Sequence, residues 1–295
     1  MKKIIYKITL CIIPIALFIG CSGNKVDKDE KLYSKADILV DETTFPDTVF
    51  REYIEWKIDL NNDMSLSADE IENVKKIVID GQKDENYSHL KSISGISYFF
   101  NLQDVRIMNC LLSEADFSEN KRLTKIVLMG EGLTSINISE NGKLEELTCF
   151  GTDLSEIDIK NNKALKALDI TGNDIGSLDV SQNTKLEELI CDSTKIKVLD
   201  ISNNKELVWL SIGGTKITSL NLTNANKLEY LCVYSTAMSE INLAKNPELL
   251  SIYCQGTNIQ TLDLSNNPKV YEVECNESTK IIGEEQLTLL ERFPE

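Results

Sequence analysis

The chain has 295 residues, with 47 acidic against 31 basic side chains, a single histidine and a net charge of −16. Such acidity excludes a nucleic-acid-binding surface, because phosphates require a basic face, and it disfavours a protein that lies flat on an anionic bilayer. The eight cysteines would suggest a disulfide framework in an exported protein, so their positions along the chain decide how they are interpreted.

Residues 1–20 have the build of a secretory signal. Three lysines within the first seven residues precede an apolar run over residues 8–20, which is shorter than the roughly 20 residues of a membrane span. The run ends in Gly20-Cys21, which resembles the lipobox of bacterial lipoproteins, although Phe18 departs from the usual Leu. The resemblance implies lipidation of Cys21 and anchoring in the cell envelope, at the outer membrane or cell surface. An ordinary signal peptide with an incidental cysteine is the alternative.

Residues 21–43 are polar, charged and poor in aromatic side chains, which indicates a flexible tether between the lipid and the folded body. The pattern changes over residues 44–101, where Phe50, Tyr53 and Ile54 follow helical spacing. This part predicts a small helical cap that ends in a divergent first coil of the repeat described below.

Within the cap, residues 59–70 resemble the twelve-residue EF-hand loop. The resemblance implies calcium, a hard cation that takes six to eight oxygen ligands, and no other cofactor is expected. Met64 departs from the family pattern, which has Gly where the chain turns sharply with positive φ. The alternative is a loop that keeps its shape between two helices without an ion. The expected ligands are Asp59, Asn61, Asp63, the carbonyl of Ser65, Ser67 and Glu70.

A repeat of 21 residues runs over residues 102–275 without insertion or deletion. Each coil carries about five apolar side chains that it cannot bury alone, so stacked coils must place like on like in a continuous core. The apolar fourth and sixth positions predict a short strand, and a second alternation predicts an extended segment on the opposite wall. Asn occupies the nineteenth position in every coil except that of Ala225. The first positions are Leu102, Leu123, Leu144, Leu165, Leu186, Leu207, Leu228, Leu249 and Val270.

The repeated unit L-x-x-L-x-[C/I]-x-x-[T/N]-x-[I/L]-x-x-[I/L]-[D/N]-[I/L]-S-x-N resembles the 21-residue class of bacterial leucine-rich repeats. The resemblance implies an α/β solenoid whose short parallel strands stack coil on coil. We expect residues 276–295 to close the solenoid with a short capping helix over residues 284–292.

Four cysteines share the inward sixth position of the repeat with Ile, Leu and Val, which predicts buried free thiols rather than disulfides. The sequence has no Cys-x-x-Cys motif, and His89 is its single histidine, so a zinc site is not expected. The four are Cys149, Cys191, Cys254 and Cys275.

The outward positions of the strands do not build the core, so their chemistry is free to serve binding. They are polar or acidic in the early coils, where Asp104, Asp169 and Glu188 are examples, and aromatic in the later ones. Stacking would gather the rings into one patch suited to partner contact. A cross-strand ladder that only stabilises the sheet is the alternative. The aromatic residues are Trp209, Tyr230, Tyr234, Tyr253 and Tyr271.

These features favour a monomeric, lipid-anchored envelope protein that recognises a protein partner or mediates adhesion through its sheet face. A glycan-capture lipoprotein and a purely structural envelope component are the alternatives, because leucine-rich repeats host many unrelated functions. Catalysis is disfavoured, since the sequence offers no nucleophile motif and no Gly-rich phosphate loop.

Overall fold

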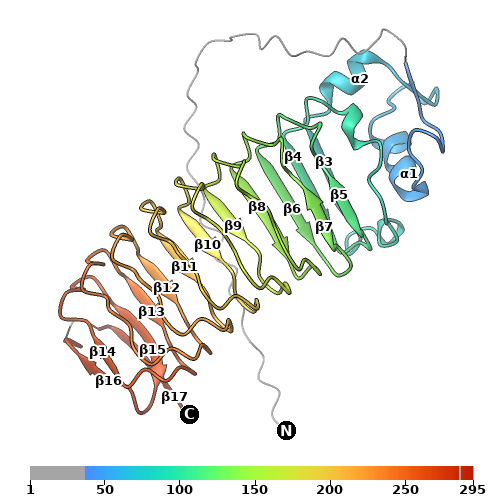
Figure 1. The fold of residues 1–295 in the computed structure, drawn as a ribbon. Helices are drawn as coiled ribbons and strands as arrows, with labels where there is room; N and C mark the ends of the chain where they lie inside the picture. The colour runs from blue at the N-terminus through green and yellow to red at the C-terminus, as the bar shows by residue number, and fades with distance from the viewer. Residues whose placement is uncertain (1–36, 286, 295) are drawn as a thin grey trace. The chain divides into compact units, whose positions relative to one another are not determined.

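The computed structural model describes residues 37–285 and 287–294. Within them the chain forms a small helical cap and then winds into a parallel solenoid of about nine turns (Figure 1). The expected signal segment, Cys21 and most of the expected tether lie outside the described residues. Neither α-helix of the described part has the length and apolar content of a membrane span.

The cap consists of α1 (Thr48–Lys57), α2 (Ala68–Asn73) and an antiparallel pair of two-residue strands, β1 (Ile38–Leu39) and β2 (Ser65–Leu66). The helix α1 begins where Asp47 accepts a hydrogen bond from the backbone N–H of Phe50, and it buries Phe50 and Ile54. A capping box between Ser67 and Glu70 starts α2. The predicted helical cap is therefore present.

The tether expected over residues 21–43 ends earlier than predicted. Ile38 and Leu39 pair with Leu66 and Ser65, and the side chain of Val40 is 2% exposed. Residues 37–43 therefore belong to the cap. The sequence concealed this because each strand is only two residues long, and such short pairings are stabilised by the tertiary packing around them.

One wall of the solenoid is a parallel sheet of 11 strands. All neighbouring strands except the first and the last pair keep the 21-residue register, as where Leu168 lies between Leu147 and Leu189. Its first strand belongs to the divergent first coil that the sequence predicts. The strands are β3 (Lys76–Asp80), β4 (Asp104–Met108), β6 (Lys125–Met129), β8 (Glu146–Phe150), β9 (Ala167–Asp169), β10 (Glu188–Ile190), β11 (Trp209–Ser211), β12 (Tyr230–Cys232), β13 (Ser251–Tyr253), β15 (Glu272–Asn276) and β17 (Leu289–Phe293).

The opposite wall carries the second extended segment that the repeat predicts. Two short parallel pairs form there, at the beginning and at the end of the solenoid. They are β5 (Glu114–Asp116) with β7 (Ser135–Asn137) and β14 (Thr261–Asp263) with β16 (Lys280–Ile282). Two short 3-10 helices, η1 (Glu85–Tyr87) and η2 (Ile96–Tyr98), connect β3 to β4.

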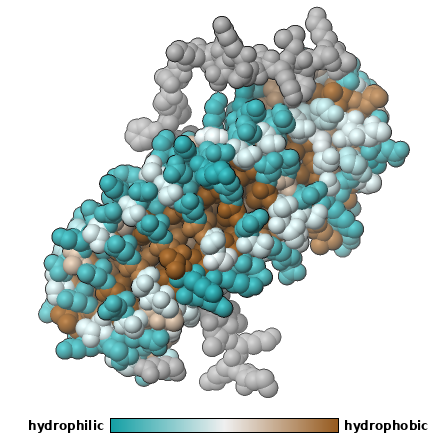
Figure 2. Space-filling model, viewed as in Figure 1, coloured by the Kyte–Doolittle hydropathy of each residue, from teal (hydrophilic) through white to brown (hydrophobic). Residues whose placement is uncertain are grey.

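Between the walls lies a continuous apolar core. Leu147, Leu168 and Leu189 are at most 1% exposed and lie opposite one another in register. Burying each such side chain contributes roughly 1.5–3 kcal/mol, so stability accumulates coil by coil. On the face turned toward the viewer in Figure 2, an apolar band runs along the solenoid between polar margins.

Asparagines at the nineteenth position form a buried ladder that joins successive coils. The side chain of Asn183 donates to the carbonyls of Ile159 and Asn162, each at 3.0 Å, and Asn204 repeats the arrangement one coil later. These bonds satisfy bend carbonyls that no strand can reach. Ala225 interrupts the ladder, and Asn246 resumes it by donating to Leu222 and Ala225.

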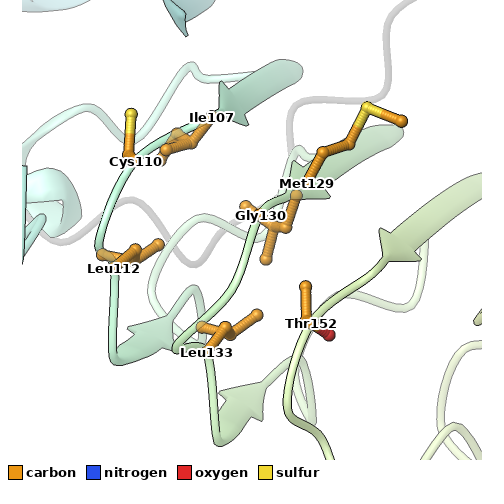
Figure 3. Close-up of a pocket in the computed structure, with 8 residues that line it drawn as sticks. Ile107, Cys110, Leu112, Met129, Gly130, Leu133 and Thr152 are labelled. Carbon is orange, nitrogen blue, oxygen red and sulfur yellow. The ribbon is translucent and has the colours of Figure 1, made fainter. Parts of the chain in front are cut away.

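Packing in the solenoid leaves little internal space. A gap between the coils of β4, β6 and β8 has room for about one water molecule and is lined by apolar side chains around Cys110, Gly130 and Thr152 (Figure 3). It is too small to hold an organic ligand, so the interior of these coils offers no small-molecule site.

The expected C-terminal capping helix is wrong, because residues 289–293 form the strand β17 beside β15. The backbone N–H of Leu289 donates to the carbonyl of Tyr271, and that of Glu277 donates to the carbonyl of Phe293. A strand wins over a helix here because the last coil presents an edge of backbone N–H and C=O groups that need partners.

Candidate binding surface

The outward face of the 11-stranded sheet is the candidate binding surface, and backbone pairing fixes which of its side chains are neighbours. Trp209 lies between Glu188 and Tyr230, and Cys232 lies opposite Tyr253. Side chains directly opposite one another on a sheet are about 4.5–5.5 Å apart at Cβ, so this register sets the acidic and aromatic residues side by side.

Two of the five predicted aromatic residues stack on each other. The ring centroids of Trp209 and Tyr230 are 4.8 Å apart with an interplanar angle of 26°, and both residues are half-buried. Tyr253 lies one strand further and donates its hydroxyl to Glu272 at 2.7 Å. Burial and this carboxylate raise the pKa of Tyr253, so its hydroxyl stays protonated and polar.

The other two predicted rings lie apart from this pair. The ring of Tyr234 covers Gly213 so closely that a Cβ on that glycine would lie 2.2 Å from the ring. Tyr271 is 41% exposed and precedes β15, so it is outside the strand alternation that holds Trp209 and Tyr230. The sequence therefore predicted too large a patch when it placed all five rings together. The stacked pair forms the centre of the aromatic surface, and Tyr271 lies off the sheet face.

Next to the stacked pair, the sheet face carries a group of carboxylates, Asp169, Glu188 and Asp192, which we call the acidic centre. Asp192 accepts hydrogen bonds from the hydroxyl of Ser211 and the backbone N–H of Gly213, both at 2.6 Å. Burial raises the pKa of Asp192 to about 6 in spite of these bonds. The pKa values of Asp169 and Glu188 are also raised, first by burial.

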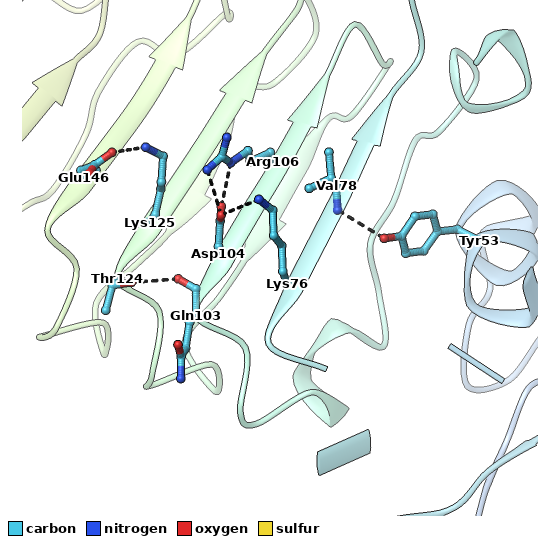
Figure 4. A network of polar contacts seen from close by, with 9 residues as sticks. All are labelled: Tyr53, Lys76, Val78, Gln103, Asp104, Arg106, Thr124, Lys125 and Glu146. Carbon is cyan, nitrogen blue, oxygen red and sulfur yellow. Dashed lines mark hydrogen bonds and ion pairs between the residues drawn. The ribbon is translucent and has the colours of Figure 1, made fainter. Parts of the chain in front are cut away.

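On the sheet face, the charged side chains of the early strands form ion pairs within the protein, whereas those of the acidic centre do not. Asp104 binds Arg106 at 2.9 Å and Lys76 at 3.1 Å, and Lys125 pairs with Glu146 (Figure 4). In the described part of the chain, no Lys or Arg forms an ion pair with a member of the acidic centre. The middle of the face therefore holds negative charge that the solenoid itself does not neutralise.

Sequence reasoning found the polar and aromatic halves of the face but not how deeply Asp192 is buried. The signal that it missed is a glycine: Gly213 lets the ring of Tyr234 lie close to the backbone beside Asp192. The sequence pattern is a glycine 21 residues after an outward-facing acidic residue, as Gly213 follows Asp192.

The loop over residues 59–70 keeps the shape that the EF-hand resemblance implies. Met64 takes φ of 63°, the left-handed conformation for which the family uses Gly. The carboxylate of Asp59 accepts from the backbone N–H of Met64 at 2.9 Å, and Glu70 accepts from those of Leu60 and Ser67. The loop thus satisfies its own carboxylates.

The other expected ligands hold the loop rather than converge on one point. Asn61 accepts from the N–H of Asp63, whose own carboxylate accepts from the N–H of Ser65, each at 3.0 Å. Among the described residues, no group of three or more acidic, cysteine or histidine side chains is arranged to hold a metal. A calcium ion would therefore have to displace hydrogen bonds made by Glu70.

The prediction of free cysteines is confirmed for the described residues. Cys149, Cys191, Cys254 and Cys275 are fully buried and unpaired, and Cys110 and Cys232 are also free thiols. Burial raises the pKa of Cys149 and of Cys254 to about 12. Thiols protonated in this way are poor nucleophiles, so their role is packing.

Comparison with solved structures identifies the class of solenoid. The structure is similar to the functional domain of InlJ from Listeria monocytogenes, with 19% sequence identity, a TM-score of 0.55 and coverage of 88% of this chain and 72% of that chain. Internalin C2 of Listeria monocytogenes matches with 20% identity and a TM-score of 0.59 over 81% of this chain and 97% of its own. The fold of the chain is therefore that of a leucine-rich-repeat solenoid, structurally like these internalin domains.

A leucine-rich-repeat protein of Leptospira interrogans has the same fold, with 15% identity, a TM-score of 0.55 and coverage of 68% of this chain and 62% of that chain. The structure of InlJ is described as including a cysteine ladder; here the inward position holds four cysteines interrupted by Ile170, Ile212 and Val233. No family model and no curated protein matches the sequence.

Proposed function

We propose that this protein is a non-catalytic recognition module that binds a protein partner through the sheet face between the acidic centre and the stacked pair of Trp209 and Tyr230. The observation that carries the proposal is the direct opposition of Glu188 and Trp209 in the sheet. It places uncompensated negative charge beside an aromatic surface, the combination that binds Lys and Arg side chains by charge and by cation–π contact.

The proposed partner is therefore a basic segment of a protein, lying across the strands. An arginine or lysine in contact with Glu188 and Asp169 would supply the positive charge that this part of the sheet face lacks. Its aliphatic stem would lie on the ring of Trp209, since long cationic side chains cover apolar surface with their methylene groups.

The test is binding of the purified full chain to a library of displayed peptides and, in parallel, to a glycan array. We expect enrichment of Lys- and Arg-containing peptides. Trp209→Ala should weaken binding at least ~10-fold, because truncating an aromatic anchor costs about 2 kcal/mol. Glu188→Gln should weaken it as well. The matched control is Val198→Ala, an apolar side chain that is 78% exposed on the coil away from the strands.

The alternatives give different results in the same experiment. Saturable glycan binding that is lost in Trp209→Ala, with no peptide binding, would support the glycan-capture lipoprotein. Absence of any ligand, with Trp209→Ala altering stability alone, would support the structural envelope component. Peptide selection that ignores basic residues would contradict the proposed partner chemistry but keep a binding role for the face.

We also propose that the protein is exported and anchored to the bacterial envelope by lipid on Cys21, at the outer membrane or cell surface. The support is the short apolar run that ends in Gly20-Cys21. Two or more acyl chains would give stable anchoring, at about 0.8 kcal/mol for each buried methylene. Mass spectrometry of the membrane fraction should find the acylated residue, and Cys21→Ser should release the chain from it.

A calcium site in the cap is a third proposal, with Asp59, Asn61, Asp63, the Ser65 carbonyl, Ser67 and Glu70 as ligands. It is supported by the left-handed turn at Met64 and by the buried carboxylate of Asp59 at the start of the loop. Oxygen ligands of this kind suit calcium. The self-satisfied hydrogen bonds of the loop imply weak affinity, because an ion must replace them.

A further inference from the structure

The cap exposes four large apolar side chains that the fold does not use. Trp56 is 79% exposed, Leu60 77%, Leu39 60% and Met64 48%. On α1, the buried side chains are Phe50, Tyr53 and Ile54, and Trp56 lies outside that set. Soluble proteins seldom leave several large apolar groups open in one region, so this group needs an occupant. We call it the cap patch.

Two members of the cap patch share one surface, and the other two belong to backbone segments beside it. Trp56 and Met64 line one shallow surface depression together with Glu55, Asp59 and Asn62. Leu39 pairs in β1 with Ser65, the residue after Met64, and the backbone N–H of Val40 donates to the carbonyl of Met64 at 2.9 Å. Leu60 directly follows Asp59. Three separate segments therefore bring exposed apolar side chains to this part of the cap.

Met64 supplies an independent sign that the cap patch serves a purpose other than folding. Its φ of 63° is a conformation that glycine adopts freely and that strains a residue with a side chain. About half of this side chain is exposed to water, so the folded cap buries only part of it. Strain kept for an exposed apolar group points to a contact outside the described chain.

The carboxylates of Asp59 and Glu55, which lie beside the cap patch, are engaged within the cap and do not hinder contact with an uncharged apolar surface. Asp59 is 2% exposed and turns its carboxylate toward the backbone N–H groups of the loop. Glu55 lies 4.0 Å from Arg51. Two exposed residues of opposite charge, Lys57 and Asp63, flank Trp56 and Met64, so the patch has no basic cluster that would attract an anionic surface, and it suits an interface of neutral headgroups.

The number of residues between Cys21 and the cap indicates which surface the cap patch can reach. The described residues begin at 37, two positions before Leu39, and only residues 22–36 separate them from Cys21. A segment of that length reaches at most ~55 Å. Lipid on Cys21 would hold the cap patch at high local concentration beside the bilayer, so weak insertion would suffice.

We propose that the cap patch docks into the neutral headgroup interface of the bilayer that holds the lipid on Cys21, with Trp56, Leu60 and Met64 inserted. This inference rests on the proposed lipid anchor. It makes the cap the membrane-proximal end and leaves the sheet face with its acidic centre accessible. Tryptophan is the residue most suited to this position, because its ring is amphipathic.

The experiment uses the lipidated full chain in vesicles of phosphatidylcholine and phosphatidylethanolamine. The chain has two tryptophans, so Trp209→Phe leaves Trp56 as the sole indole emitter. We expect its emission to shift to shorter wavelength in vesicles and to lose intensity when the acyl chains are brominated. The matched control carries Trp56→Phe, Trp209→Phe and Val198→Trp, and its emission should stay unshifted and unquenched.

The outcomes separate the inference from the proposed anchor. Mass spectrometry first establishes whether Cys21 carries acyl chains. With the lipid present, Trp56 emission like that of a water-exposed peptide overturns docking and leaves the anchor intact. Without the lipid, anchor and docking fail together. A blue shift that appears in lipid-free buffer for Cys21→Ser, with a doubled sedimentation mass, would overturn docking by assigning the patch to a second copy.

Discussion

At the residue scale, the asparagine ladder shows how one side chain type fixes the spacing of coils. Each amide donates to two carbonyls of the preceding coil, as Asn183 does to Ile159 and Asn162. The bend that these bonds hold contains no strand pairing, so loss of the amide leaves carbonyls without their second donor. Such a bond contributes about 0.5–1.5 kcal/mol net, and an abandoned buried group costs about 1–3 kcal/mol.

The ladder predicts opposite effects for two substitutions. Asn183→Ala should lower the free energy of unfolding by about 1–3 kcal/mol, because it removes both hydrogen bonds at a fully buried position. Ala225→Asn should raise it by about 1 kcal/mol by completing the ladder toward Ile201 and Asn204. Urea denaturation of both variants measures this. Equal stability of parent and Asn183→Ala would show that the ladder is not stabilising.

At the element scale, hydrogen bonds within the loop between α1 and α2 hold its two ends together, and they also set the ionisation of Glu70. Glu70 caps α2 and also accepts from Leu60, so it connects both ends of the loop. Burial raises the pKa of Glu70, but hydrogen bonds from Ser67 and the loop backbone outweigh it and lower the pKa overall. The carboxylate is therefore ionised at neutral pH, and a cation would compete with these hydrogen bonds for it.

The calcium proposal is tested by titration calorimetry on the full chain. We expect weak binding, in the micromolar-to-millimolar range, that is lost in Glu70→Gln. Gln at this position still completes a capping box, so α2 should persist in the variant. Met64→Gly should bind more tightly, since it removes the strain of the left-handed turn. Absence of heat in both the parent and Met64→Gly would end the proposal.

At the scale of the whole molecule, the negative charge on the sheet face is concentrated in one region. Ion pairs form on the sheet face of the early coils, and the acidic centre concentrates carboxylates without an ion pair beside the aromatic rings. Asp192 faces Asp169 on β9, Ser211 on β11 and Tyr234 after β12, and burial is the main cause of its raised pKa. A cationic partner would lower that pKa, so binding should release protons.

The raised pKa of Asp192 makes stability depend on pH in a specified direction. Its pKa is about 6 in the folded protein against 3.8 as the ordinary value. The folded state therefore holds the proton more tightly, and this contribution to stability is lost as pH rises from about 4 through 6. Asp192→Asn should melt a few degrees higher than the parent near pH 7.5, and the difference should vanish near pH 4.

The matched control for this pH dependence is Asp200→Asn. Asp200 is fully exposed on the opposite wall, and a hydrogen bond from the backbone N–H of Ser202 lowers its pKa. Because the folded state here favours the ionised form, this variant should melt slightly lower than the parent at neutral pH. Differential scanning calorimetry across the pH range distinguishes the two signs, and a parallel response would refute the assignment to Asp192.

The sequence by itself determined the coil. Apolar side chains at set positions of a 21-residue period can be buried only by stacking, so the parallel sheet and the inward cysteines followed from the pattern. It also determined the composition of the sheet face, because strand alternation assigns Glu188 and Trp209 to the outside. These are local, repeated features, and each coil repeats the evidence for them.

Tertiary structure alone decided what happens where the repeat ends and where side chains meet. The strands β1 and β17 form because neighbouring edges need hydrogen-bond partners, although the sequence indicated a tether and a helix there. The burial of Asp192 depends on Gly213 and Tyr234 from later coils. The exposed Trp56 and Met64 come from α1 and the loop after it, and the pairing of β1 with β2 sets Leu39 beside them. These contacts join positions that the 21-residue repeat does not relate to one another. Their contribution to the free energy of folding therefore cannot be read from the repeat and depends on the folded structure.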